Sequence, residues 1–436
     1  MSKKYSEDED YKWEDEYQWD DSYSEFDDRF DDVEEEDVPR RKTTKSASSA
    51  KAASGKRTGS SAKSSSAKKA AARKKKRRKK MIMVAVIEVL LLALVCLGLF
   101  IVSQFNKIQP PSTGDGPGKV QFGVNGDVQV NDIPSGNLEK MEGYTTFALF
   151  GIDKRNMASL NDGLSDVIII VSVDESTGEI NMVSVYRDTY LQTNKNGEFS
   201  KINAAYNWGG PVQAIEALNT NLDLTIDHYV TVNWFAVAKA IDEMGGVDIE
   251  VPEEIFYAKI PDSLGGGYWL NSYIETTAAA TGLPVTYVKG PGFQTLNGLQ
   301  AVALCRIRQV GMDYGRADMQ RQVVAQLFEK AKKTNLATLI AISKNVFPNI
   351  QTDMSLSDIS ALIPGLTKYY LAESTGFPSV RGAAMMGTLD CIIAKDLLTN
   401  VKELHRVLYG NDVYVPSDQV IELSEHIARA SGIYAD

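Results

Sequence analysis

SDVIIIVSVD, residues 165–174, is a nearly continuous run of apolar and β-branched side chains. A run of this composition and length predicts a central strand that is buried on both faces. Apolar stretches flank it at residues 145–153 and 180–189, and each predicts a further strand. Because helical patterns then alternate with strands, the sequence predicts an α/β fold with a mixed central sheet.

Apolar periodicity outlines the remaining elements. It predicts strands at residues 228–233, 247–252, 377–384 and 391–394. It predicts helices at residues 209–223, 234–246, 296–308, 317–333, 336–346, 355–369 and 394–410. Residues 253–293 are rich in glycine, threonine and alanine, and we expect a long excursion there that carries little core.

Composition divides the 436-residue chain, whose formal net charge is -10, into unlike segments. Residues 1–39 are crowded with acids, whereas residues 40–80 are basic and contain none. Neither part can bury enough apolar surface to fold alone, so we expect a disordered tail over residues 1–80. A basic block by itself is typical of nucleic-acid binding. The apolar run that follows makes this reading unnecessary, and we expect no nucleic-acid partner.

Residues 81–103, MIMVAVIEVLLLALVCLGLFIVS, predict a transmembrane helix. At about 1.5 Å per residue the run spans roughly 35 Å, enough for a bilayer core of about 30 Å. The basic block on its N-terminal side places the tail in the cytoplasm and residue 104 onward outside the cell. We therefore expect an extracellular linker at 104–141, a globular domain at 142–412 and a polar tail at 413–436.

Two aspartates stand at the ends of predicted strands. Asp153 ends the first strand and Asp166 opens the second. If these strands are antiparallel neighbours, both carboxylates lie at one edge of the sheet. Such a pair can hold a hard divalent ion such as Mg2+, which keeps several waters and shares a phosphate with its substrate. The alternative is that each aspartate caps a loop.

Arginines follow the same strands and continue into residues 304–322. Arg187 ends the third strand beside Asp188. The two residues form either a surface ion pair of little energetic weight or a cleft arginine that Asp188 orients. Arg306 and Arg308 alternate in the sequence. An extended backbone would point both side chains to one face, whereas a helix would separate them.

A second pair of polar residues stands in the next predicted helix. Arg316 and Gln320 lie one turn apart, so they share a helical face. Arginine supplies planar, bidentate donors to phosphate oxygens. Guanidinium groups from several elements near paired carboxylates therefore fit a divalent metal with a phosphate or pyrophosphate. The cysteines Cys96, Cys305 and Cys391 make no disulfide framework, and we expect them to pack as small hydrophobes.

Six ordered motifs resemble the LytR-CpsA-Psr family. They are FALFGIDKR at 147–155, SDVIIIVSVD at 165–174, VSVYRDT at 183–189, KINAAYNWGG at 201–210, GFQTLNGLQAVALCRIRQ at 292–309 and DYGRADMQRQ at 313–322. The resemblance covers residues 144–333 strongly and extends to about residue 410. A cytoplasmic segment and a single membrane span before the domain are also similar to members of the family.

The resemblance implies an enzyme, an extracytoplasmic Mg2+-dependent phosphotransferase. Such an enzyme moves a glycopolymer, for example a teichoic acid or capsule chain, from a polyprenyl-pyrophosphate carrier to peptidoglycan through a phosphodiester bond. The implied location is the cell membrane of a Gram-positive-type envelope, with the N-terminus in the cytoplasm and the catalytic domain outside. The implied fold is an α-β-α sandwich with a hydrophobic pocket for the prenyl chain. We expect residues 168–171, Leu327 and Phe328 to line it, with a plain packed core as the alternative.

The roles of family residues carry over to matching positions. Asp153 and Asp166 match the Mg2+ ligands, with Mn2+ as an alternative metal. The positions expected in catalysis are Arg187, Asp188, Arg306 and Arg308. The positions expected at the pyrophosphate are Arg155, Arg187, Arg306, Arg308, Asp313, Arg316 and Gln320.

Two positions depart from the family pattern. Leu164 and Met319 stand where the family usually has arginine. We expect Arg155 to supply the charge that Leu164 lacks. Arg321, one residue after Gln320, would point to a different helical face, so we assign it no role at the pyrophosphate.

Two other functions fit the same residues. One is a membrane-anchored module that binds lipid phosphate or a polyanion without chemistry. The other is a lipid pyrophosphatase, in which water replaces the acceptor hydroxyl. The products distinguish the three functions.

Overall fold

The computed structural model describes residues 100, 102–108, 131–153, 160, 163–308, 312–355, 357 and 368–434. The predicted tail at 1–80 and nearly all of the predicted span at 81–103 lie outside these residues, as does most of the predicted helix at 355–369. In this described part of the chain, no helix combines the length and apolar character needed to cross a membrane.

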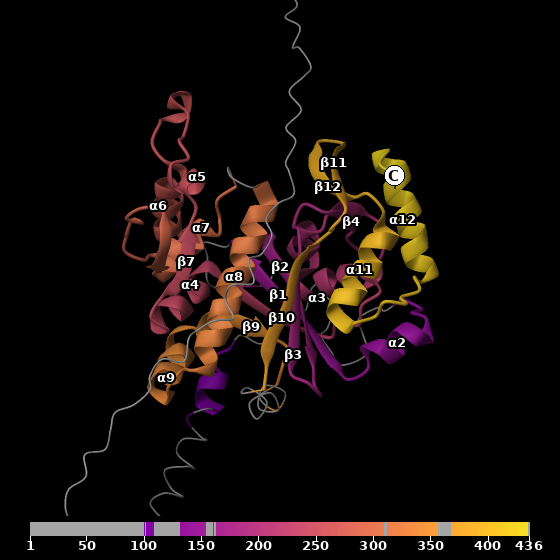
Figure 1. Ribbon diagram of the computed structural model, residues 1–436, viewed down its shortest axis with the longest axis horizontal. Coiled ribbons are helices and arrows are strands. Elements are labelled where there is room, and N and C mark those ends of the chain that lie inside the picture. Colours follow the sequence, from indigo (N-terminus) through magenta and orange to yellow (C-terminus); the bar gives the residue numbers. More distant parts are fainter. Residues whose placement is uncertain are drawn as a thin grey trace, which may run out of the picture. The chain divides into compact units, whose positions relative to one another are not determined.

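A six-stranded mixed sheet forms the centre of the domain (Figure 1). Its strands, in spatial order, are β10 (Tyr370–Phe377), β3 (Glu179–Val185), β2 (Ser165–Asp174), β1 (Tyr144–Ile152), β6 (His228–Asn233) and β9 (Ile350–Thr352). The pairs β1–β6 and β3–β10 are parallel, and the other three pairs are antiparallel. The predicted α/β fold with a mixed central sheet is confirmed.

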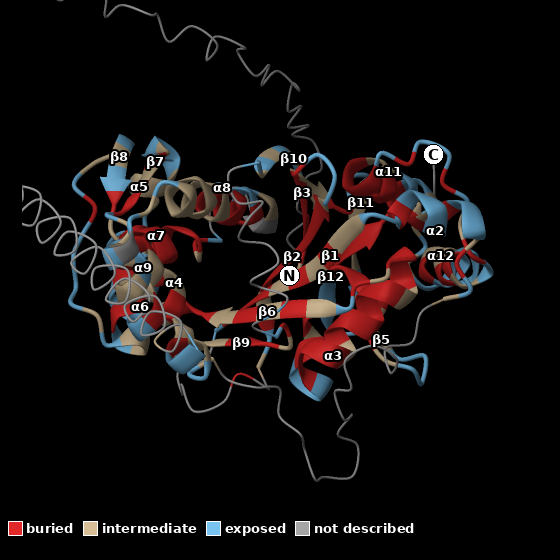
Figure 2. Cartoon of the chain, turned by 90° about the horizontal axis from the view of Figure 1, so that it is seen from below, coloured by how far each residue is buried: buried red, intermediate tan, exposed pale blue. Residues whose placement is uncertain are grey.

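Strand β2 is buried on both faces, as its composition predicts. Ile168 and Ile170 face a core shared with α3 (Asn203–Leu222), α11 (Leu397–Tyr409) and α12 (Asp418–Ser431). Val167, Ile169 and Val171 face a second core, shared with α4 (Trp234–Glu243), α7 (Gly298–Leu304) and α8 (Met312–Lys332). Helices therefore cover both faces of the sheet, and Figure 2 shows its strands largely buried. Each fully buried aliphatic side chain contributes roughly 1.5–3 kcal/mol.

A smaller lobe is built on the strand pair β7 (Val247–Val251) and β8 (Gly292–Leu296). The expectation that residues 253–293 carry little core is wrong. They include α5 (Glu253–Phe256), η2 (Asp262–Leu264) and α6 (Trp269–Thr281). Leu270, Ile274 and Ala278 of α6 are buried in the lobe's own core. The apolar stripe of α6 repeats every four residues among threonines and alanines, which hides it in the sequence.

Both ends of the predicted globular domain need correction. Residues 413–436 are not simply a polar tail, because they include α12, whose Val420, Leu423 and Ile427 are buried in the main core. The other face of α12 is polar, which explains the misreading. At the other end, α2 (Ser135–Met141) lies within the predicted linker, yet Ile133 and Met141 are buried. The packed domain thus includes residues on both sides of 142–412.

Other predicted elements are found with shifted ends. Helix α3 begins at Asn203 rather than at residue 209, and it is kinked at Gly209 and Gly210. The predicted strand at 377–384 takes in the last residue of β10 and the first four residues of β11 (Arg381–Met386), and the one at 391–394 lies within β12 (Leu389–Ala394). The remaining elements are β4 (Tyr190–Gln192), β5 (Phe199–Lys201), α9 (Leu336–Asn345), η3 (Phe347–Asn349), β11 (Arg381–Met386) and β12 (Leu389–Ala394).

Candidate active site

A small polar pocket lies where β1 ends and β2 begins. Its volume is about 50 Å3, and it is lined by Asp153, Asp166, Trp234, Tyr273, Cys305, Arg306, Arg308, Arg316 and Gln320. Six of these are residues that the sequence singles out: both predicted metal ligands and four of the predicted pyrophosphate-binding positions. They come from β1, β2, α8 and the segment after α7. The fold therefore gathers them from distant parts of the sequence.

The antiparallel pairing of β1 and β2 places the two carboxylates together. Gly151 pairs with Val167, but the next residue, Ile152, pairs with Ser165. The register thus passes over Asp166, which is the extra residue of a β-bulge. Bulges of this kind redirect a side chain and are common beside active sites. The predicted hairpin geometry, with Asp153 and Asp166 at one edge of the sheet, is confirmed.

Arg306 is held on three sides. Its Nη2 donates to Asp153 Oδ2 at 2.9 Å, and its Nη1 donates to Thr277 Oγ1 at 2.8 Å. Its guanidinium carbon lies 5.9 Å from the centre of the Trp234 ring. A planar guanidinium fixed by an acid, a hydroxyl and an aromatic face has little rotational freedom left to lose when it binds an anion.

Arg187 is anchored to the other carboxylate. Its Nη1 lies 2.5 Å from Asp166 Oδ1, and its Nε lies 3.4 Å from Asp188 Oδ2. Lys201 Nζ lies 3.0 Å from the second oxygen of Asp188, and Arg308 Nη2 lies 4.0 Å from Asp166. The predicted Arg187–Asp188 pair is present and only slightly exposed. Asp188 therefore lies between two cations, Arg187 and Lys201.

Helix α8 supplies the remaining side chains of the pocket. Arg316 and Gln320 are both buried and both line it, as their spacing predicts. Gln320 Nε2 donates to the backbone oxygen of Cys305 at 3.1 Å. Burial raises the pKa of the Cys305 thiol to about 12, with Arg316 opposing the shift. Cys305 is therefore a neutral packing residue, which agrees with its predicted role.

The departures from the family pattern have different surroundings. Leu164 is 48% exposed, so an arginine at this position would have been free to reach solvent or the site. Met319 is buried in the core of the smaller lobe, where its thioether packs among aliphatic side chains. Arg321 pairs with Asp318 and does not line the pocket, as expected from its helical face.

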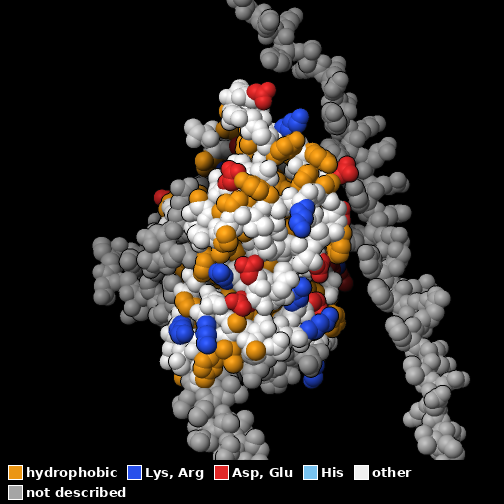
Figure 3. Space-filling view, turned by 90° about the vertical axis from the view of Figure 1, so that its left-hand side faces the viewer, with side chains coloured by type: hydrophobic (Ala, Val, Ile, Leu, Met, Phe, Trp, Pro, Cys, Tyr) orange, Lys and Arg blue, Asp and Glu red, His pale blue; other side chains and the backbone are white. Residues whose placement is uncertain are grey.

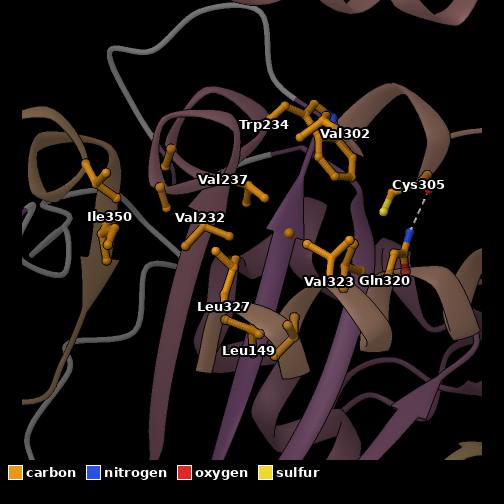
Figure 4. A pocket seen from close by; sticks show the side chains of 16 residues that line it. Leu149, Val232, Trp234, Val237, Val302, Cys305, Gln320, Val323, Leu327 and Ile350 are labelled. Atoms are coloured by element: carbon orange, nitrogen blue, oxygen red, sulfur yellow. Dashed lines mark hydrogen bonds between the residues drawn. The ribbon is translucent and has the colours of Figure 1, made fainter. Parts of the chain in front are cut away.

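An apolar pocket of about 230 Å3 adjoins the polar one (Figure 4). Trp234, Cys305 and Gln320 line both pockets. The other lining residues are Leu149, Gly151, Val167, Val232, Ala236, Val237, Ala240, Val302, Val323, Val324, Leu327, Val346 and Ile350. Figure 4 shows their side chains converging from the sheet and from the helices around one space.

Only part of the predicted lining is correct. Leu327 lines the apolar pocket, but Phe328 and the run at 168–171 pack in the adjoining cores instead. The strand contributes Val167, beside Gly151 on β1. A Cβ atom at Gly151 would lie 2.8 Å from Cβ of Val167. The absence of a side chain at Gly151 therefore keeps this part of the pocket open.

Some predicted residues are not tested, and some pocket residues were not predicted. Arg155 and the side chain of Asp313 lie outside the described residues. The unpredicted residues are Trp234 and Tyr273, which line the polar pocket, and Thr277, which accepts a hydrogen bond from Arg306. Tyr273 and Thr277 lie on α6, in the stretch read as an excursion, and only their spacing of four residues could have indicated a shared helical face.

The two carboxylates fit a hard divalent cation. Within the described ranges, no cluster of three or more His, Cys, Asp and Glu side chains could hold a metal ion. Asp153 and Asp166 nevertheless offer carboxylate oxygen atoms in one pocket, beside three arginines and Gln320. Mg2+ is commonly held by one or two carboxylates together with substrate phosphates and water. The donor set therefore suits a metal that arrives with, or is completed by, a phosphate.

Comparison with known proteins identifies relatives. A model of the LytR_cpsA_psr family matches residues 119–376. The polyisoprenyl-teichoic acid–peptidoglycan teichoic acid transferase TagV of Bacillus subtilis (strain 168) is 26% identical over 260 residues, which are 58% of this chain and 61% of TagV. The chain thus matches less than two thirds of the length of TagV. The similarly named TagU of Enterococcus faecalis (strain ATCC 700802 / V583) is 26% identical over 255 residues, 58% of this chain and 73% of TagU.

A solved structure shares the fold. A crystal structure of a Streptococcus agalactiae protein superposes with a TM-score of 0.51 at 21% identity. The match covers 66% of this chain and 93% of that protein. At this level of identity the likeness concerns the fold alone.

Proposed function

The chain belongs to the LytR-CpsA-Psr family, and from this we propose that it is an extracytoplasmic phosphotransferase that attaches a glycopolymer to peptidoglycan. Its donor would be a polyprenyl-pyrophosphate-linked glycopolymer, such as a teichoic acid or capsule chain. The new bond would be a phosphodiester. The names of TagV and TagU support this substrate class.

The observation that carries the proposal is the junction of the two pockets. The apolar pocket is lined almost wholly by aliphatic side chains, which suits the hydrocarbon chain of a prenyl lipid. The polar pocket presents three arginines and two aspartates, which suits a pyrophosphate with a divalent cation. Trp234, Cys305 and Gln320 line both, so a single amphipathic ligand could occupy the two pockets at once. Few ligand classes other than a prenyl pyrophosphate join these two chemistries.

The geometry suggests how the reaction would proceed. An acceptor hydroxyl attacks the phosphorus that carries the glycan, a new O–P bond forms, and the bridging P–O bond to the prenyl phosphate breaks. The hydroxyl proton passes to a base, and prenyl phosphate leaves. Arg306 and Arg308, which line the polar pocket, and Arg187, which pairs with Asp166, would neutralise charge on the leaving phosphate, which is the main task of such a site. Asp153 and Asp166 would hold Mg2+, which supplies further neutralisation when bound.

The proposed location follows from the sequence. The apolar run at 81–103 and its basic flank predict a membrane anchor with the catalytic domain outside the cell. A prenyl-linked donor is confined to the outer surface of the membrane. An anchored enzyme therefore meets it by diffusion in two dimensions.

The direct test is product analysis. We would incubate the purified full chain with a pyrophosphate-linked lipid glycan, Mg2+ and peptidoglycan oligomers, and then search for a phosphodiester-linked conjugate by mass spectrometry. The proposal expects a conjugate that disappears with EDTA and in Arg187→Ala. Release of free phosphorylated glycan would instead identify a pyrophosphatase. Tight lipid binding without either product, across several donors, would identify a binding module.

A further inference from the structure

One face of α6 leads outward from the polar pocket. Thr277, Tyr273 and Trp269 are spaced by four residues, so they lie on the same side of the helix. Thr277 accepts the hydrogen bond from Arg306, and Tyr273 lines the pocket beside Asp153. The ring centres of Tyr273 and Trp269 are 6.4 Å apart. These three side chains, called the aromatic stripe below, therefore connect Arg306 to the indole ring of Trp269.

A finger of the smaller lobe, residues 257–268, continues from this stripe. Backbone hydrogen bonds fix its base: Trp269 N donates to Ala258 O at 2.9 Å, and Ile260 N donates to Gly267 O at 2.9 Å. Two aromatic rings stand exposed there, Tyr257 at 55% and Tyr268 at 40%. Figure 3, which faces this side of the molecule, shows hydrophobic side chains gathered over its upper part.

We propose that Trp269 and Tyr273, extended by Tyr268 of the finger, form a subsite that binds the pyranose ring of a saccharide next to the phosphates. The apolar C–H face of a pyranose packs against an aromatic ring, and its hydroxyl groups need polar partners nearby. Tyrosine and tryptophan combine a large apolar ring with one polar group, which suits such a ligand. This inference rests on the proposed function, because the saccharide bound there would be either the glycan of the donor or the glycan acceptor.

The alternative occupant of an exposed aromatic surface is a lipid bilayer. Two observations favour the saccharide. The aromatic stripe is continuous with the polar pocket, because Tyr273 lines that pocket together with Arg306, Arg308 and Arg316. The end of the predicted membrane span lies elsewhere, since the ring of Phe100, within that span, is 5.9 Å from Lys344 Nζ on α9. In Figure 1, α9 is at the bottom of the domain, whereas α5 and α6 are at the top.

The test compares ligands that differ only in their sugar. We would measure dissociation constants of the full chain in detergent for a polyprenyl pyrophosphate without sugar, for the same lipid carrying a disaccharide, and for a soluble peptidoglycan oligosaccharide. The variants are Trp269→Ala, Trp269→Phe and Tyr273→Leu. The matched control is Phe293→Ala, which removes a ring that is 74% exposed on β8, away from the stripe. Circular dichroism verifies that each variant is folded.

We expect Trp269→Ala to weaken binding of at least one sugar-bearing ligand about tenfold or more, with partial rescue in Trp269→Phe. Trp269→Ala should bind the sugar-free lipid as the wild-type chain does, and Phe293→Ala should bind every ligand as the wild-type chain does. A loss on the lipid disaccharide assigns the subsite to the donor, and a loss on the oligosaccharide assigns it to the acceptor. Unchanged binding of both sugars, equal losses with and without sugar, or a loss only of binding to phospholipid vesicles would overturn the proposal. Failure of the wild-type chain to bind the sugar-free lipid would count against the proposed function instead.

Discussion

Arg306 donates to Asp153 at 2.9 Å across 153 residues of sequence, joining the segment after α7 to the end of β1. The family resemblance implies a metal-binding role for the aspartate and a pyrophosphate-binding role for the arginine. In the structure each neutralises the other, and Arg187 and Asp166 form a parallel pair. A cation that bound these carboxylates would therefore compete with the guanidinium groups and would leave them available to the anion. Binding of the metal should therefore raise the affinity for pyrophosphate, and binding of pyrophosphate should raise the affinity for the metal.

The first prediction concerns metal affinity. Arg306→Gln removes a positive charge beside Asp153 and should raise the affinity of the lipid-free chain for Mn2+ about tenfold, equivalent to ~1.4 kcal/mol. The same variant should lower glycopolymer transfer roughly 100-fold, because a charge on the pyrophosphate loses its partner. Electron paramagnetic resonance of free Mn2+ measures the first effect. Arg429→Gln, on the exposed surface of α12, is the control, and weaker Mn2+ binding in Arg306→Gln would contradict the competition.

Arg187 offers a test of geometry rather than charge. Arg187→Lys keeps the cation, but a single ammonium group cannot contact both Asp166 and Asp188 as the guanidinium does. We expect single-turnover transfer to slow roughly 100-fold with an unchanged circular dichroism spectrum. Arg187 pairs with Asp166, which lines the polar pocket, as well as with Asp188. Lys201→Met is the comparison, because the ion pair of Lys201 is with Asp188, and this variant should slow transfer much less. Equal effects in the two variants would mean that only the charge around Asp188 matters.

The apolar pocket can be filled from α8. Val323→Phe replaces a small aliphatic side chain by an aromatic ring among the lining residues. It should weaken binding of long-chain polyprenyl pyrophosphates at least tenfold. Binding of a short-chain analogue should change less, because its tail needs less of the pocket. Overpacking also costs about 1–3 kcal/mol of stability. Thermal unfolding of Val323→Phe and of the surface control Leu339→Phe separates that cost from the ligand effect, and an unchanged long-chain affinity would show that the prenyl chain lies elsewhere.

The sequence predicts the central sheet and the site carboxylates for one physical reason. Residues 165–174 are buried on both faces, so their composition indicates a strand without knowledge of the partners. Once two strands are antiparallel, Asp153 and Asp166 must share an edge. The β-bulge at Asp166, in contrast, has no signal in composition, since it depends on pairing with Gly151 and Ile152.

Elements with mixed faces were harder to predict. Helix α6 buries Leu270, Ile274, Thr277 and Ala278, its other residues include threonine and alanine, and a glycine-rich stretch precedes it. The contact from Arg306 to Thr277 joins residues 29 apart through tertiary packing, which no local pattern encodes. The apolar pocket was misassigned for a similar reason, because the choice between Val167 and the adjoining isoleucines depends on the missing side chain at Gly151.

A buried histidine predicts the acid response of the fold. Burial lowers the pKa of His405 to about 4, from an ordinary value of about 6.5 in the unfolded chain. Because the folded state binds the proton less well, stability is fully present above about pH 6.5 and falls as the pH drops toward 4. The loss should be on the order of 3 kcal/mol. Urea unfolding between pH 7 and pH 4 measures it, and His405→Phe should show a flatter dependence over this window.

Substitutions in α12 test whether residues 413–436 pack as a helix or form a polar tail. Leu423 is 3% exposed in the main core, whereas Ile421, two residues earlier, is 36% exposed. Leu423→Ala should therefore lower the free energy of unfolding by about 2–5 kcal/mol, since it removes buried methyl groups and leaves a cavity. Ile421→Ala deletes a similar volume at the surface and should cost well under half as much. Urea denaturation of the two variants decides the matter, because a tail that does not pack would give the same small effect at both positions.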